Sequence, residues 1–123
     1  MSVVYVVDDD PSVRDWAESV CEDLGFSCRT FPGGEAFLSA LDGLAPGCLL
    51  LDMRMPRPNG LTVQAELAAR NSPMPVIAMT GYGDVDVAVQ SMRLGAIEFL
   101  EKPFARDVLQ EALEKGFRQL DAS

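Results

Sequence analysis

Hydrophobic and polar positions divide the chain into short apolar runs and longer amphipathic stretches, which alternate along its length. The apolar runs predict buried strands over residues 3–7, 26–31, 48–51, 75–79 and 96–100. The amphipathic stretches carry apolar residues at helical spacing and predict helices near residues 11–24, 36–43, 61–70, 85–94 and 105–120. This strict alternation predicts a single α/β domain over residues 1–123, with a parallel sheet and helices on both faces.

Local signals indicate where several of these elements begin and end. Asp10 suits the N-cap of the first helix, Pro11 suits its first position, and Gly25 suits its C-terminal stop. Asp84 is expected to cap the fourth helix. Residues 26–31 alternate apolar and polar side chains, which favours a place near an edge of the sheet.

Polar side chains follow four of the five predicted strands directly. Asp8 and Asp9 follow the first, Asp52 the third, Thr80 the fourth and Lys102 the fifth. Ligands of open parallel sheets bind beyond the carboxyl ends of the strands, so we expect these five side chains to converge on one site.

This set of side chains favours phosphate chemistry. Carboxylates at close quarters raise one another's pKa unless a cation compensates, and Mg²⁺ prefers such oxygen ligands. A carboxylate can attack phosphorus to form an acyl phosphate. Lys102 offers a positive charge and Thr80 a hydroxyl for phosphate oxygens. The sequence therefore predicts a site that captures a phosphoryl group on a carboxylate.

Composition excludes several other classes of function. The net charge of -9 argues against direct nucleic-acid binding, because a nucleic-acid interface needs clustered basic residues. The chain contains no histidine, which excludes serine–histidine and cysteine–histidine catalysis. The spacing of its three cysteines fits neither a disulfide framework nor a zinc site. No apolar run is long enough to cross a membrane and the N-terminus does not resemble a signal peptide, so we expect a cytoplasmic location without membrane attachment.

The residues at the strand ends also carry a family resemblance. The segments concerned are Val6-Val7-Asp8-Asp9-Asp10, Leu50-Leu51-Asp52-Met53-Arg54-Met55-Pro56, Met79-Thr80-Gly81 and Phe99-Leu100-Glu101-Lys102-Pro103-Phe104. In order and spacing they resemble the receiver domains of bacterial two-component response regulators. The likeness is strongest to receivers of helix-turn-helix transcription regulators of the nitrogen-fixation type. It implies a flavodoxin-like (βα)5 fold with strand order 2-1-3-4-5.

The resemblance assigns a role to each candidate residue. Asp52 would be the phosphoacceptor. Asp9, Asp52 and the backbone carbonyl of Arg54 would bind Mg²⁺ directly, with Mn²⁺ as an alternative ion, and Asp8 would assist through water. Lys102 and Thr80 would hold the phosphoryl oxygens, and the Lys102–Pro103 peptide bond would be cis.

Three further side chains have alternative interpretations. Phe99 is either an aromatic switch residue that responds to phosphorylation together with Thr80, or a core aromatic near the sheet edge. Arg54 and Tyr82 either restrict access of water to the acyl phosphate, or are two solvated side chains.

The resemblance also implies partners. A sensor histidine kinase or a phosphotransfer protein would donate the phosphoryl group, and the domain would catalyse its own phosphorylation and slow dephosphorylation without being a conventional enzyme. Phosphorylation could drive homodimerisation through the face of the fourth helix, fifth strand and fifth helix, and control an attached or partner DNA-binding domain.

Two other functions compete with this interpretation. An aspartate-nucleophile phosphatase would need a second acid–base aspartate where Arg54 stands. A flavodoxin-like cofactor binder would need a phosphate-binding turn after the first strand, where the residues are acidic.

Overall fold

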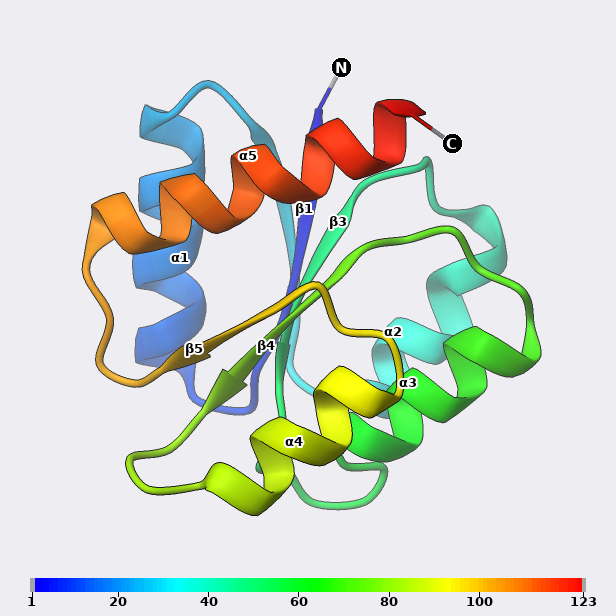
Figure 1. The fold of residues 1–123 in the computed structure, drawn as a ribbon. Coiled ribbons are helices and arrows are strands. Elements are labelled where there is room, and N and C mark those ends of the chain that lie inside the picture. The colour runs from blue at the N-terminus through cyan, green and yellow to red at the C-terminus, as the bar shows by residue number, and fades with distance from the viewer. Residues whose placement is uncertain (1, 123) are drawn as a thin grey trace.

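The strands form one parallel sheet with helices on both of its faces (Figure 1). The computed structural model describes residues 2–122. The strands are β1 (Val3–Val7), β2 (Ser27–Phe31), β3 (Cys48–Asp52), β4 (Val76–Thr80) and β5 (Glu98–Glu101). Their order, β2-β1-β3-β4-β5, confirms the expected topology and places β2 at an edge.

Helices follow every strand. They are α1 (Pro11–Asp23), α2 (Gly34–Ala40), α3 (Gly60–Ala69), α4 (Val85–Arg93) and α5 (Arg106–Ala122), and a short 3-10 helix, η1 (Leu41–Gly43), extends α2. Figure 1 shows α1 and α5 on one face of the sheet and α2, α3 and α4 on the other. None of the helices within residues 2–122 combines the length and the apolar character needed to cross a bilayer.

Each face of the sheet has its own hydrophobic core. Side chains of α1 and α5 pack on one face around Val6, Leu50 and Met79. Side chains of α2 and α3 pack on the other face around Leu49 and Leu51. Burial on both faces explains why the central strands are continuous apolar runs in the sequence, as is typical of a parallel sheet.

The bounds of four strands, β2 to β5, differ from the prediction by one or two residues. Asp52 and Thr80 are the last residues of β3 and β4, and lie within the sheet rather than after it. Pairing explains the extension, because Asp52 lies beside Met79 and Thr80 beside Glu101 in the ladder. The fifth strand begins at Glu98, two residues later than expected, and ends at Glu101. The two site residues are therefore fixed by backbone pairing.

The predicted boundaries of the first helix are confirmed. The Asp10 side chain accepts a hydrogen bond from the Ser12 amide, Pro11 is the first residue of α1, and Leu24 is its C-cap. Gly25 follows with a φ of 89°, a left-handed conformation that glycine adopts without strain.

Candidate functional site

Three carboxylates gather at the carboxyl ends of β1 and β3. Asp8, Asp9 and Asp52 each offer an oxygen, and these oxygens lie within 4.8 Å of one another. Asp8 and Asp52 are buried, whereas Asp9 is exposed. The sheet order accounts for the cluster, because β1 and β3 are neighbouring parallel strands whose carboxyl ends lie at the same edge.

Lys102 extends into this cluster from the segment after β5. Its Nζ lies 2.8 Å from Asp8 Oδ2 and 3.3 Å from Asp52 Oδ1. The Lys102 backbone amide donates to the Thr80 carbonyl at 2.7 Å, and the Lys102–Pro103 bond is cis, as expected. The lysine therefore bridges the two buried carboxylates while its backbone is tied to the end of β4.

Asp8 is oriented by several hydrogen bonds. Its Oδ1 accepts from the Asp10 amide at 2.9 Å, and its Oδ2 accepts from Lys102 at 2.8 Å. Its backbone carbonyl accepts from the Arg14 guanidinium, one turn into α1, at 2.8 Å. The buried carboxylate thus has a partner on each oxygen, as a buried charge requires.

Asp52 is less completely compensated. Its Oδ1 accepts from the Arg54 amide at 3.2 Å and lies 3.3 Å from Lys102 Nζ. Burial and the nearby negative charge of Asp8 raise the pKa of Asp52 to about 6, although Lys102 opposes the shift. Burial alone would lower the pKa of Lys102, but its contacts with Asp8 and Asp52 outweigh burial and raise it. The cluster thus has an excess of negative charge that the lysine does not neutralise.

Gly60 allows α3 to begin close to the carboxyl end of β3. A Cβ at this position would lie 2.7 Å from the Asp52 carbonyl oxygen, too close for any side chain. The Gly60 amide also donates to the Met53 carbonyl at 3.3 Å. Gly60 therefore has a packing role beside Asp52.

The donor set fits a hard divalent cation. Mg²⁺ binds carboxylate and carbonyl oxygens, usually with several waters, and the excess negative charge at Asp8, Asp9 and Asp52 calls for a cation. Within residues 2–122 this is the only such group of three acidic, histidine or cysteine ligands. The participation of the Arg54 carbonyl stays a prediction.

Thr80 and Phe99 lie on neighbouring strands with opposite exposure. Thr80 is buried at the end of β4, whereas Phe99 on β5 is 43% exposed. The interpretation of Phe99 as a core aromatic is therefore wrong. It lies on an edge strand, where it lines a groove between β5 and α4 together with Thr80, Val89 and Met92. Its role as a switch residue stays a prediction.

Arg54 and Tyr82 flank the site differently. Tyr82 is 90% exposed in the turn after β4. Arg54 is also exposed, but its guanidinium forms a bidentate ion pair with Asp84, with Nε 2.7 Å from Oδ2. Asp84 is the N-cap residue of α4, as predicted, yet its side chain does not cap the helix. The expectation of a capping side chain is thus wrong, because the carboxylate pairs with Arg54 instead.

Sequence reasoning missed two other polar contacts, one at the site and one between α3 and α4. Arg14 binds the Asp8 carbonyl, and Gln64 of α3 pairs with Ser91 of α4. The Ser91 hydroxyl donates to Gln64 Oε1 at 2.7 Å, and Gln64 Nε2 donates to the Ser91 carbonyl at 3.1 Å. A glutamine among the apolar positions of α3 was the one signal available in the sequence.

Comparisons with known proteins agree with this geometry. The profile of the response regulator receiver domain matches residues 4–114. The transcriptional regulatory protein FixJ of Bradyrhizobium diazoefficiens is 43% identical over 118 residues, which are 96% of this chain and 58% of FixJ. The response regulator protein TmoT of Ectopseudomonas mendocina is 39% identical over 95% of this chain and 53% of TmoT. The chain thus spans little more than half the length of these relatives.

Solved structures give the same result for the fold. A crystal structure of full-length FixJ from B. japonicum has a TM-score of 0.93 and 43% identity, covering 97% of this chain and 59% of FixJ. The structure of FixJ-N has a TM-score of 0.92 and 35% identity, covering 96% of this chain and 94% of FixJ-N. The expected resemblance to receivers of nitrogen-fixation-type regulators is confirmed, and the phosphatase alternative is not favoured. The chain belongs to the response regulator receiver domain family, whose members act in phosphorelay signalling and are not conventional enzymes.

Proposed function

We propose that residues 1–123 act as one receiver domain in which Asp52 accepts a phosphoryl group from a phosphohistidine. The donor is a sensor histidine kinase or a phosphotransfer protein, and the reaction takes place in the cytoplasm. The observation that carries the proposal is the convergence of Asp8, Asp9 and Lys102 on a buried Asp52 at the carboxyl edge of the sheet.

The transfer needs a nucleophile and partners for the phosphoryl oxygens. An Asp52 oxygen attacks phosphorus, the bond between phosphorus and the donor's histidine nitrogen breaks, and the histidine leaves while an acyl phosphate forms on Asp52. Lys102, 3.3 Å from Asp52, offers its ammonium group to one oxygen, and Thr80 at the end of β4 offers its hydroxyl to another. The domain itself therefore supplies the groups that promote its phosphorylation.

A divalent cation completes the site in this proposal. Asp9, Asp52 and the Arg54 carbonyl would hold Mg²⁺, or Mn²⁺ in its place, with Asp8 assisting through water. When bound, the ion screens the negative charge between the carboxylates and the incoming phosphoryl group. Lys102 then keeps its contact with Asp8, which leaves the exposed Asp9 and an oxygen of Asp52 for the metal.

The output of the switch is the face formed by α4, β5 and α5. Thr80 and Phe99 line the groove between α4 and β5, so movement of the Thr80 hydroxyl toward the phosphoryl group would let Phe99 turn inward. Exposed apolar residues on this face, Val89, Met92 and Val108, support phosphorylation-dependent homodimerisation and control of a DNA-binding output domain. Thr80→Ala should therefore abolish the phosphorylation-dependent change at Phe99.

Phosphorylation by a small phosphodonor with Mg²⁺ tests the assignment of Asp52. The mass of the intact wild-type protein should increase by one phosphoryl group, and Asp52→Asn should show no increase. Asp42→Asn serves as a matched control, because the Asp42 side chain is 91% exposed and lies in η1. A phosphoryl group that persists in Asp52→Asn would overturn the assignment.

Thermal unfolding with Mg²⁺ tests the cation site separately. A ligand that binds the folded state raises its stability, so Mg²⁺ should raise the melting temperature of the wild-type protein. Asp9→Asn should remove most of this increase, and Asp42→Asn should retain it. Equal increases in all three proteins would contradict the proposed metal ligands.

A further inference from the structure

Three helices begin after a residue whose side chain can cap an N-terminus, but only two of them are capped by it. Asp10 accepts from the Ser12 amide ahead of α1, and Asn59 accepts from the Thr62 amide ahead of α3. Asp84 ahead of α4 makes no such bond, and its backbone (φ -82°, ψ 53°) lies outside the extended region that both other caps adopt. The first turn of α4 therefore lacks the side-chain cap that its sequence provides.

The missing cap is explained by Arg54. Its Nε donates to Asp84 Oδ2 at 2.7 Å, and its second nitrogen contacts Oδ1, so both carboxylate oxygens are occupied. The hydrogen bond from Arg54 lowers the pKa of Asp84, which keeps the pair charged at neutral pH. Asp84 is thus held by a residue of the β3–α3 segment, in an orientation that makes no hydrogen bond to its own helix.

Arg54 is also next to the phosphoacceptor. Its backbone amide donates to Asp52 Oδ1 at 3.2 Å, while its side chain is 66% exposed and free to adopt another rotamer. A phosphoryl group brings roughly two negative charges and oxygens that match the planar guanidinium. Phosphorylated Asp52 would therefore compete directly with Asp84 for Arg54.

α4 is the helix on which such competition has the greatest effect. Its fully buried residues are Ala88 and Ser91, and Val87, which is partly buried, is the one side chain of α4 that packs against a hydrophobic core. A side-chain cap stabilises a helix N-terminus enough to change a local opening equilibrium by about fivefold. With so little apolar packing, a change of this size is sufficient to shift the conformation of the first turn of α4.

We infer that the Arg54–Asp84 ion pair is a phosphate-sensitive tie between the phosphoacceptor loop and α4. Before phosphorylation Arg54 holds Asp84 away from the helix. After phosphorylation Arg54 turns to the phosphoryl oxygens, and the released Asp84 caps the first turn of α4. Asp84 is then a positioning residue that acts through Arg54. The inference rests on the proposed phosphorylation of Asp52, but its first half applies to the unphosphorylated protein.

Amide hydrogen exchange of Asp86 and Val87, followed by NMR, tests the tie. Arg54→Gln releases Asp84, so these amides should exchange about fivefold more slowly without phosphate. Asp84→Asn can cap but cannot form the ion pair, and should also exchange slowly in both states. The wild-type protein should reach this protection only after phosphorylation. Asp84→Ala should show no such slowing in either state.

Arg70→Gln provides the matched control. Arg70 forms a comparable surface ion pair with Glu66 on α3, and its loss should leave the first turn of α4 unchanged. Wild-type exchange rates at α4 in unphosphorylated Arg54→Gln would overturn the tie. If the mass increase shows a phosphoryl group on Asp52 while α4 stays as before, the phosphate trigger is overturned. Absence of the mass increase with slow exchange in Arg54→Gln would instead overturn the proposed function and leave the tie supported.

Discussion

The helices α1 and α4 both follow strands that end at the site, yet they are held in different ways. α1 is capped by Asp10 and buries Ala17, Val20 and Cys21 in the core that it shares with α5. α4 has no side-chain cap and buries only Ala88 and Ser91. α1 is therefore fixed mainly by apolar packing, whereas α4, with only Val87 against a core, relies more on polar contacts.

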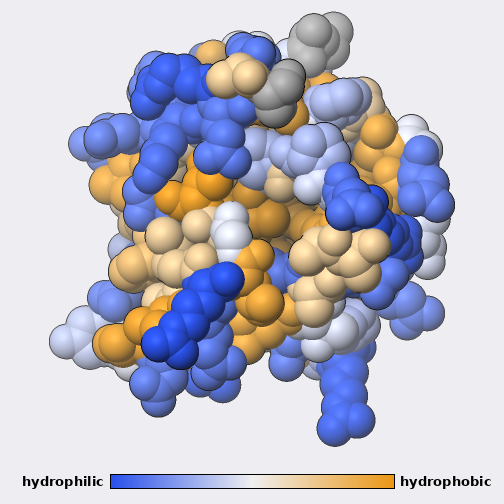
Figure 2. Space-filling view, turned by 45° about the vertical axis from the view of Figure 1, so that its right-hand side comes forward, coloured by the Kyte–Doolittle hydropathy of each residue, from blue (hydrophilic) through white to orange (hydrophobic). Residues whose placement is uncertain are grey.

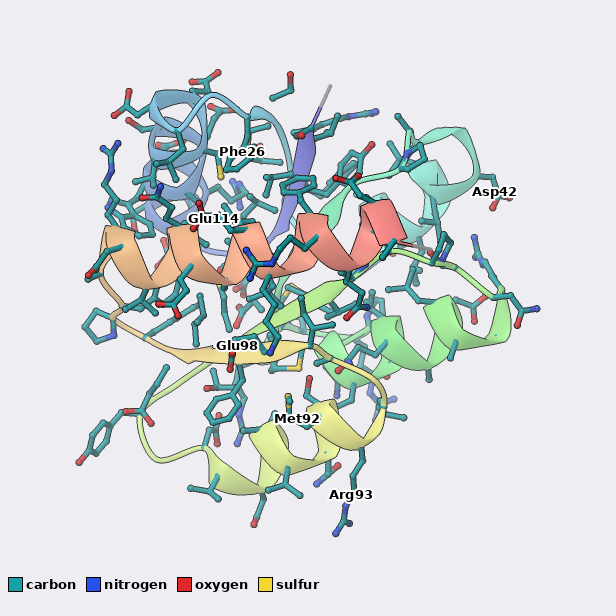
Figure 3. All side chains as sticks on the ribbon, turned by 45° about the horizontal axis from the view of Figure 1, so that its top comes forward. Phe26, Asp42, Met92, Arg93, Glu98 and Glu114 are labelled. Carbon is teal, nitrogen blue, oxygen red and sulfur yellow. The ribbon has the colours of Figure 1, made fainter. Side chains whose placement is uncertain are left out.

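The difference suggests how one domain can be both stable and switchable. Apolar burial is large and non-directional, so it does not respond to one added charge. Polar contacts such as Arg54–Asp84 and Gln64–Ser91 have specific partners that a charge can exchange. Figure 2 shows hydrophobic residues in the hollow of one face, and in Figure 3 Met92 extends from α4 toward β5. α4 thus lies beside the open groove that Thr80, Phe99 and Met92 line.

Truncation of one side chain in each region should produce the largest difference in the free energy of unfolding. Leu113 of α5 is fully buried in the core that it shares with α1, and Leu113→Ala should lower the free energy of unfolding by about 2–5 kcal/mol. Met92 of α4 is 40% exposed and outside both cores, so Met92→Ala should cost less, about 1 kcal/mol at most. Urea unfolding of both variants measures the difference. Equal losses would show that α4 is packed as firmly as the α1–α5 side.

The site between the two regions should make stability depend on pH. The pKa of Asp52 is about 6 in the folded state against 3.8 ordinarily, because of burial and Asp8, so the folded protein binds more protons between these values. The contribution of Asp52 to the free energy of unfolding is fully present below pH 3.8. It is lost as the pH rises through 6, and the loss is at most about 3 kcal/mol.

Asp52→Asn isolates this effect. Without Mg²⁺, the variant should be more stable than the wild-type protein at pH 7, and the difference should disappear toward pH 4 because Asp52 is then protonated. Asp15→Asn, at an exposed position of α1, is the control and should keep the wild-type pH profile. A wild-type profile in Asp52→Asn would show that Asp52 is not the group responsible.

The Gln64–Ser91 contact offers a test of how α4 is attached to α3. Both side chains are buried, so Ser91→Ala leaves Gln64 Oε1 without its donor and Gln64→Leu leaves the Ser91 hydroxyl without its acceptor, each at a cost of about 1–3 kcal/mol. Gln64→Leu and Ser91→Ala should each lower stability by this amount, and the double variant should lose less than the sum. A double-mutant cycle by urea unfolding measures the coupling, and simple additivity would exclude it.

Most of the site could be predicted because it depends on topology. Parallel strands bring the residues at their carboxyl ends together, so the positions of Asp8, Asp52, Thr80 and Lys102 followed from the apolar runs before them. The burial of these side chains was harder to predict from the sequence. Asp52 and Thr80 proved to be the last paired residues of their strands, since ladder pairing depends on the neighbouring strand and not on local hydropathy.

The errors lie where a local rule competes with a distant partner. Capping preference correctly placed Asp84 before α4, but its carboxylate pairs with Arg54, 30 residues earlier in the sequence. Phe99 was a candidate for the core because aromatic side chains are usually buried, yet it lies on an edge strand and lines an open groove beside α4, where it is 43% exposed. Only tertiary structure decides between such alternatives.

The smallest and most specific effect concerns the two aspartates at the N-caps. Asp10→Ala removes a cap that α1 uses, and should lower the free energy of unfolding by about 1 kcal/mol. Asp84→Ala removes an exposed ion pair but no cap, so it should cost about 0.5 kcal/mol or less.

Urea unfolding at low and high salt distinguishes the loss of an ion pair from the loss of a helix cap. The Asp84→Ala effect should fade with salt because solvent ions screen the Arg54–Asp84 pair, and the Asp10→Ala effect should largely persist because the cap is a short hydrogen bond. If Asp84→Ala costs as much as Asp10→Ala at high salt, then Asp84 already caps α4 in the unphosphorylated protein, and the contrast between the two helices fails.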